Sequence, residues 1–159
     1  MWIAASLTLL SLGALAMATR QPLIFPPLGP TALLMFATPR LPTAAPRNAF
    51  VGHLVGMTVG WASLWAFGLL GEPSALLAGF TLPRVGAAAF SLGLTGAITS
   101  RWAPHPPAGA TTLIISLGVL ARPTQLAALM AAVVLLIGLA SGLNRLAEKI
   151  GRPGFGREA

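Results

Sequence analysis

Four long runs of mostly apolar residues constrain the fold of this chain more than any other feature. They cover residues 2–19, 49–70, 85–100 and 124–146. As α-helices, runs of about 20 such residues match the thickness of the hydrocarbon core of a bilayer. Only 8% of the 159 residues are charged, against roughly a quarter in a typical soluble domain. We therefore predict an all-α integral membrane protein with four long transmembrane helices, located in the cell inner (plasma) membrane.

The basic residues give the chain a net charge of +7, but their positions argue against nucleic-acid binding. Most lie at or near the end of an apolar stretch, where cations can reach lipid headgroups by snorkelling. No basic face interleaved with stacking aromatics is present. The chain also lacks cysteine, which excludes disulfides and thiolate chemistry. The basic residues at the ends of apolar stretches are Arg20, Arg40, Arg47, Arg84, Arg101, Arg122, Arg145 and Lys149.

The first apolar run allows a second interpretation. Ala16-Met17-Ala18 resembles a signal-peptidase site, so residues 2–19 could be a cleaved signal peptide. No Lys or Arg precedes the run, however, as a signal peptide would require. We therefore favour a membrane-spanning helix.

Two shorter segments, residues 25–38 and 105–119, share a motif. The sequences FPPLGPTALL and HPPAGATTLI align without gaps in the pattern x-P-P-x-G-x-T-x-L. Each segment lies between two of the long runs. This internal repeat predicts two pseudo-symmetric halves within a single membrane domain, residues 1–159. We place the first half at 1–70, a linker at 71–80, the second half at 81–146 and a polar C-terminal tail at 147–159.

The paired prolines predict two short helices that interrupt the membrane-spanning pattern. Proline fixes φ and lacks an N–H, so it suits the first positions of a helix and not its interior. The backbone N–H groups of the residues that follow the two prolines would then point outward at the positive end of a helix dipole. In transporters, paired broken or re-entrant helices of this kind line the substrate pathway. The alternative is a proline-rich interfacial loop that leads into an ordinary short helix. The candidate pathway residues from the two motifs are Pro26, Pro27, Gly29, Thr31, Pro106, Pro107, Gly109 and Thr111.

The distribution of cations favours short segments that cross the bilayer over segments that re-enter. Re-entry would leave the two sides with equal numbers of basic residues, whereas crossing makes them unequal, as the positive-inside rule expects. Crossing also gives three passes per half and hence an inverted repeat. Crossing places Arg40, Arg47, Arg101, Arg145, Lys149, Arg152 and Arg157 on the side of the N-terminus, and Arg20, Arg84 and Arg122 on the other side.

Small residues recur at one-turn spacing on two of the long segments. Gly52, Gly56 and Gly60 form one such row, which lets another helix backbone approach closely. A second row consists of small residues within 86–97. We expect these two faces to pack against each other.

The string His105-Pro106-Pro107-Ala108-Gly109-Ala110-Thr111, with Pro46-Arg47-Asn48 and Gly52-His53 upstream, resembles the HPP family of integral membrane proteins. The resemblance extends over nearly the whole chain. It implies four membrane-spanning helices and a transport role. Some photosynthetic members are associated with nitrite uptake, so the resemblance also makes nitrite a candidate substrate.

His53 and His105 are the only histidines, and both lie within or beside a membrane segment. Ionisable groups at such positions are costly and commonly functional. An imidazole could donate a hydrogen bond to an anion or carry a proton, although a histidine that only caps a helix end is the alternative for each. We expect the pathway to include Arg47, Asn48 and Arg101 as well, with the arginines attracting the anion.

These residues predict a transporter or channel for a small inorganic anion, with no cofactor. The only acids, Glu72, Glu148 and Glu158, lie outside the middle of the spans, so we expect neither enzymatic activity nor a metal site. The small size of the chain makes a homo-oligomer in the lipid bilayer the expected assembly. The alternative function is a non-transporting membrane scaffold or accessory subunit.

Overall fold

The computed structural model of the protein describes residues 2–149, and the regular secondary structure in this part of the chain is helical, without a β-strand. The all-α prediction is therefore confirmed for the described residues. Most of the predicted tail, residues 150–159, lies outside them. The long helices are α1 (Trp2–Thr19), α3 (Pro46–Ala66), α5 (Leu82–Trp102) and α7 (Pro123–Lys149). The short elements are α2 (Leu28–Ala37), the 3-10 turn η1 (Pro42–Ala44), α4 (Ala75–Ala78) and α6 (Pro107–Ser116).

Proline and glycine set most of the helix boundaries. Helix α3 begins at Pro46, three residues before the predicted run, because proline is well suited to the first turn of a helix. It ends at Ala66, and Gly68 follows with a φ of 66°. Helix α6 ends in the same manner before Gly118, whose φ is 80°. Glycine is favoured at both positions because this left-handed conformation is strained for other residues.

Three helices, α1, α3 and α7, are long and apolar enough to cross a membrane. Helix α5 is as long as α3, with 21 residues, but it is less apolar. Its buried face carries Arg84, Ser91, Thr95 and Thr99 instead of large apolar residues. The structure thus has the four expected long helices, and membrane crossing by α5 stays a prediction.

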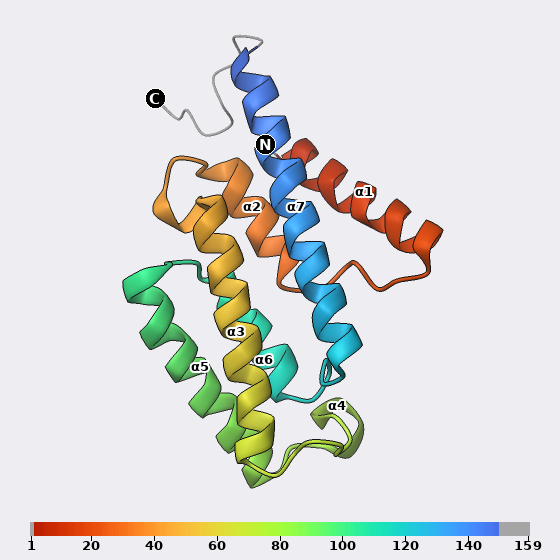
Figure 1. The fold of residues 1–159 in the computed structure, drawn as a ribbon, viewed down its shortest axis with the longest axis vertical. Helices are drawn as coiled ribbons and strands as arrows, with labels where there is room; N and C mark the ends of the chain where they lie inside the picture. The colour runs from red at the N-terminus through yellow and green to blue at the C-terminus, as the bar shows by residue number, and fades with distance from the viewer. Residues whose placement is uncertain (1, 150–159) are drawn as a thin grey trace.

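The long helices α3 and α7 lie side by side along the long axis and run in opposite directions (Figure 1). Helices α1 and α2 pack against α7 at one end, and α5 and α6 pack against α3 at the other. The chain reverses direction at each step from α1 to α2, α3, α5, α6 and α7 (Figure 1). The start of α1 and the end of α7 therefore lie toward the same end of the molecule, opposite α4.

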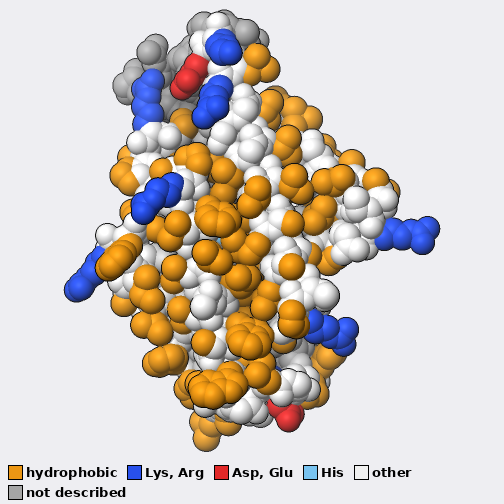
Figure 2. All heavy atoms as spheres, in the orientation of Figure 1, with side chains coloured by type: hydrophobic (Ala, Val, Ile, Leu, Met, Phe, Trp, Pro, Cys, Tyr) orange, Lys and Arg blue, Asp and Glu red, His pale blue; other side chains and the backbone are white. Residues whose placement is uncertain are grey.

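The interior has an apolar part and a polar part. Between α1, α2 and α7, large apolar side chains are fully buried, among them Leu12, Phe36 and Leu136. Between α3, α5 and α6, most buried side chains are small or polar, and Leu64 and Ile115 are the large apolar ones. On the outside, apolar side chains spread over the face shown in Figure 2, with Lys and Arg mostly at its margins. Such a surface suits contact with lipid acyl chains.

The glycine row on α3 does make a close helix contact, but its partner was predicted wrongly. A Cβ at Gly52 would lie 2.9 Å from the Cβ of His105, and a Cβ at Gly60 would lie 2.9 Å from the carbonyl oxygen of Thr112. The row therefore faces α6 and His105, which lies just before that helix. In α5, by contrast, a Cβ at Gly93 would meet nothing within 4 Å. Glycine at one-turn spacing identifies a face that can be approached closely, but it does not identify the approaching helix.

Candidate functional site

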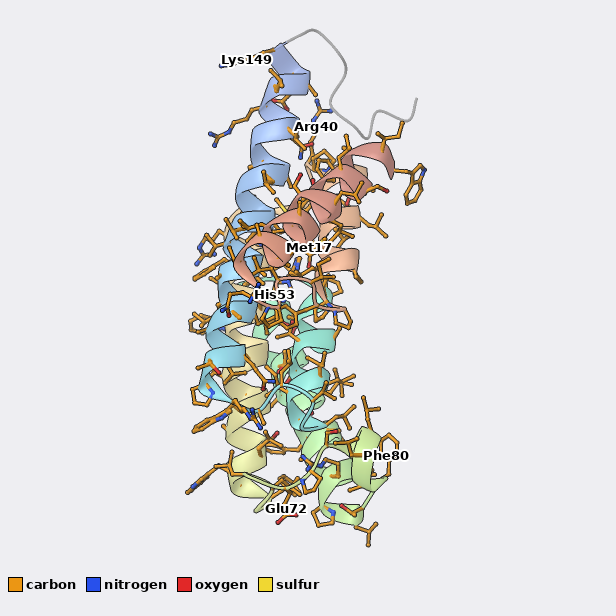
Figure 3. The ribbon with its side chains drawn as sticks, turned by 90° about the vertical axis from the view of Figure 1, so that its right-hand side faces the viewer. Met17, Arg40, His53, Glu72, Phe80 and Lys149 are labelled. Atoms are coloured by element: carbon orange, nitrogen blue, oxygen red, sulfur yellow. The ribbon has the colours of Figure 1, made fainter. Side chains whose placement is uncertain are left out.

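His53 lies about halfway along the molecule, on α3, and its side chain is fully buried (Figure 3). Glycines at positions 52 and 56 flank it and let α6 approach the same face of α3. Both ring nitrogens are within hydrogen-bond distance of a threonine hydroxyl. Nε2 lies 2.8 Å from Oγ1 of Thr31, and Nδ1 lies 2.6 Å from Oγ1 of Thr111. The two threonines occupy the same position in the two repeated motifs, so this imidazole joins the motifs.

His105 completes the cluster from the loop that precedes α6. Its Nε2 lies 3.1 Å from the same Thr31 hydroxyl, and its Nδ1 lies 2.8 Å from the backbone carbonyl oxygen of Thr43 in η1. The two imidazole rings meet edge to face, with centroids 4.9 Å apart and an interplanar angle of 67°. We call the four buried side chains Thr31, His53, His105 and Thr111 the His–Thr cluster.

The Thr43 carbonyl sets the direction of every hydrogen bond in the cluster when both rings are neutral. A carbonyl oxygen only accepts, so Nδ1 of His105 must carry a proton and Nε2 must accept. Thr31 then donates to His105 and accepts from Nε2–H of His53. Nδ1 of His53 in turn accepts from the Thr111 hydroxyl. The result is a single continuous chain in which each link has one donor and one acceptor.

The same heavy atoms can also hold one extra proton. The Thr31 hydroxyl lies 2.9 Å from the carbonyl oxygen of Pro27, which is a second acceptor for its proton. If His105 is protonated at Nε2, it donates to Thr31, and Thr31 donates to Pro27 instead. The Thr31 oxygen then accepts two hydrogen bonds and donates one, which is the full capacity of a hydroxyl. The cluster can therefore exist in a neutral and a singly charged form without unsatisfied groups.

The two motifs are buried in nearly the same pattern. Pro26 and Pro106 are exposed, whereas the prolines that follow them are buried. Over residues 25–36 and 105–116, the burial of matched positions differs only at Pro30 with Ala110 and at Leu33 with Leu113. Gly29 and Gly109 are both half-buried. Equivalent residues thus have equivalent surroundings in the two short helices.

Some backbone donors that the paired prolines were expected to leave free already have acceptors. The N–H of Thr31 donates to the carbonyl of Pro27 at 3.4 Å, and the N–H of Gly109 donates to that of Pro106 at 3.0 Å. These bonds close the first turns of α2 and α6. The polar character of the site therefore comes from its side chains more than from its helix N-termini.

The other predicted site residues lie around the cluster and not in it. Asn48 donates from Nδ2 to the carbonyl oxygen of Pro42 at 2.8 Å, which fixes η1, the turn that binds His105. Arg47, in the first turn of α3, and Arg101, in the last turn of α5, are exposed. The structure does not bring these two arginines to the histidines.

Two features of the site were missed in the sequence. The Thr43 carbonyl is a backbone group, so no residue type signals it. The second feature is the row of buried hydroxyls on α5 with Arg84 at its start. The four-residue spacing of Ser91, Thr95 and Thr99 was visible in the sequence and could have indicated a polar buried face.

No curated protein and no solved structure matches this chain. One family model, described as "HPP, transmembrane region", matches residues 1–153 and so covers nearly the whole sequence. The matched region includes both short helices and the complete His–Thr cluster. The chain belongs to the HPP transmembrane family.

Proposed function

We propose that this protein carries a small inorganic anion across the membrane through the His–Thr cluster. The observation that carries the proposal is the pair of fully buried histidines where the short helices α2 and α6 meet α3, with hydrogen bonds that accommodate one added proton. A protonated His105 would supply a positive charge inside the bundle for an anion to neutralise. Within the described part of the chain, the partners of the two rings are hydroxyls and a backbone carbonyl, with no carboxylate that would compete with that anion.

Movement of the short helices is part of this proposal. The cluster is closely packed around the two rings, so an anion reaches them only if α2 or α6 separates from α3. Two halves related by pseudo-symmetry, as the repeated motif predicts, would make such movement reversible from either side. Matched packing supports these halves: α1 packs on α2 as α5 packs on α6, and α7 packs on α2 as α3 packs on α6. The shared burial pattern of the two motifs supports them as well.

Anion flux into proteoliposomes tests the proposed function. Vesicles with the full chain would be given nitrite, nitrate or chloride, and uptake would be compared with protein-free vesicles of the same lipid. Nitrite is the first anion to test because of the family resemblance. We expect uptake of at least one of these anions above the protein-free level. Uptake equal to that of empty vesicles for all three would favour the alternative, an accessory membrane scaffold.

A further inference from the structure

Arg84 is a buried charge that the His–Thr cluster does not use. It lies in the first turn of α5 and is only 3% exposed, unlike the other described arginines, which lie at the surface. It was expected to snorkel into the headgroup region, but its guanidinium instead points inward. Nη2 donates to the carbonyl oxygen of Pro73 at 2.8 Å, and Nη1 donates to that of Ser116 at 3.4 Å.

These bonds leave the guanidinium charge without a counter-ion. A guanidinium has five N–H donors, and within the described chain Arg84 donates to two carbonyls and forms no ion pair. Gly118 leaves room for the group, since a Cβ there would lie 2.8 Å from Nη1. The surrounding backbone is thus shaped around the guanidinium. A buried, unpaired arginine is costly in a membrane protein and commonly marks an ion site.

A cavity of about 240 Å³ adjoins this guanidinium at the linker end of the molecule. Its lining includes Arg84, Thr81 and the backbone of two glycines with positive φ, Gly68 and Gly79. Glu72 also lines it, but this carboxylate is exposed and forms no ion pair with Arg84 in the described chain. Figure 3 shows Glu72 at the lower end of the molecule, far from the cluster around His53. The cavity is large enough for a small anion.

Buried hydroxyls lie on the same buried face of α5 as Arg84, further along the helix. Arg84 contacts Ser116 at the end of α6, and Gly109 near its start faces Leu92. This antiparallel register puts Ser91 and Thr95 at the level of the first turn of α6, where the cluster lies. The hydroxyls of Thr95 and Thr112 are buried and make no hydrogen bond within the described chain. Buried polar groups without a partner are rare in native structures, and a bound water or ion is one common reason for them.

We propose that Arg84 and this cavity form a second anion site, the mouth through which a small inorganic anion enters the hydroxyl-lined face of α5. The inference rests on the proposed function for its role in transport, but anion binding at Arg84 can be measured without it. The phosphate of a lipid headgroup has the same charge and hydrogen-bonding chemistry. The experiment therefore separates a free anion from a lipid.

Equilibrium chloride binding to the full chain in a neutral detergent tests the site. The readout is broadening of the chloride-35 nuclear resonance and its reversal by added nitrite. We expect Arg84→Gln to weaken the specific broadening by at least about tenfold, since it removes the charge-assisted hydrogen bonds. Arg122→Gln is the matched control, because Arg122 is an exposed arginine at the same end of the molecule. It should bind chloride as the wild-type protein does.

A charge-preserving variant tests the role of the guanidinium, and a lipid-binding measurement separates a free anion from a lipid headgroup. Arg84→Lys keeps the charge without the planar fork, so its affinity for chloride should lie between those of wild type and Arg84→Gln. If Arg84→Gln does not fold, undiminished binding in Arg84→Lys overturns the site. Chloride binding that is lost in His53→Ala and kept in Arg84→Gln also overturns it. Native mass spectrometry with added phosphatidylglycerol measures whether the protein binds this lipid at Arg84. Lipid binding that depends on Arg84, without any chloride binding, would refute the assignment of the site to a free anion.

Discussion

The hydroxyl of Thr31 has three hydrogen-bond partners, and it has one proton to give. Pro27 O, Nε2 of His53 and Nε2 of His105 all lie within 3.1 Å of its Oγ1. The protonation state of His105 decides whether Nε2 of His105 or the carbonyl oxygen of Pro27 receives that proton, while Nε2 of His53 donates to Thr31 in both forms. This threonine is therefore the residue through which a change of charge on His105 reaches the first turn of α2.

Removing this hydroxyl should disturb the site much more than removing the Thr31 methyl group. Thr31→Val keeps the shape but leaves two buried ring nitrogens without a partner, which costs about 1–3 kcal/mol of stability. Thr31→Ser keeps the oxygen and should cost about 1 kcal/mol or less. Thermal unfolding in detergent measures the first effect, and nitrite uptake should be lower for the valine variant. Equal stability and uptake in the two variants would show that the hydroxyl chain has no role.

The histidines and threonines of the site were identifiable from the sequence, but their connections were not. The repeat marked Thr31 and Thr111 as equivalent, and both histidines were obvious as rare ionisable groups in apolar segments. Nothing in the residue types indicated that the Thr43 carbonyl orients His105. The burial of Arg84 was also unpredictable, because an arginine at a helix start can either snorkel outward or cap another helix, and tertiary packing decides which occurs.

At the scale of elements, the contact between α3 and α6 holds the cluster together. Backbone approaches backbone here: a Cβ at Gly56 would lie 2.5 Å from the carbonyl oxygen of Ala108. The glycine spacing correctly predicted a close-packed face on α3, but the predicted partner was α5. Helix α6 was expected to form the start of a pathway, and its packing against the glycines of α3 was not foreseen. The short helices themselves were predicted correctly, because their paired prolines determine where a helix can start.

A methyl group added to this groove should separate α3 from α6. Gly56→Ala has no flexible side chain to displace, so we expect a loss of stability of about 1–3 kcal/mol from overpacking. Gly93→Ala in α5 is the control, because nothing lies within 4 Å of the added Cβ. It should be neutral or slightly stabilising, since alanine favours helix more than glycine does. Unfolding of both variants in the same detergent provides the comparison, and equal stability would contradict the tight contact.

At the scale of the whole molecule, the buried polar groups are unevenly distributed. Within the described chain they gather between α3, α5 and α6, whereas α1, α2 and α7 enclose the large apolar side chains. This asymmetry agrees with the composition of α5, which is less apolar than α1, α3 and α7. The sequence indicated the four long helices, the two short proline-initiated helices and their order, but not α4 in the predicted linker. It did not indicate the unequal character of the two halves, because hydroxyl residues occur at surfaces and interiors alike.

The alternation of helix direction predicts that the ends of the long axis face opposite sides of the membrane. The chain has no cysteine, so single cysteines can be introduced at exposed positions without a background. Glu72→Cys in the linker and Lys149→Cys at the end of α7 lie at opposite ends (Figure 3). A membrane-impermeant maleimide added to sealed vesicles should label one of them from outside and the other only after the membrane is opened. Labelling of both from the same side would contradict this topology.

Nitrite uptake by His105 variants in proteoliposomes tests the central claim most directly. His105→Ala and His105→Gln both remove the group that can take up a proton, so each should reduce uptake by about tenfold or more, with folded yield close to wild type. Arg122→Ala, at an exposed arginine, should stay within about twofold of wild type, as expected for a surface change. Wild-type uptake should also fall as the pH rises through the range over which His105 loses its proton. Unchanged uptake in folded His105→Gln and His105→Ala would contradict the account, and His105 would then be a residue that only anchors η1.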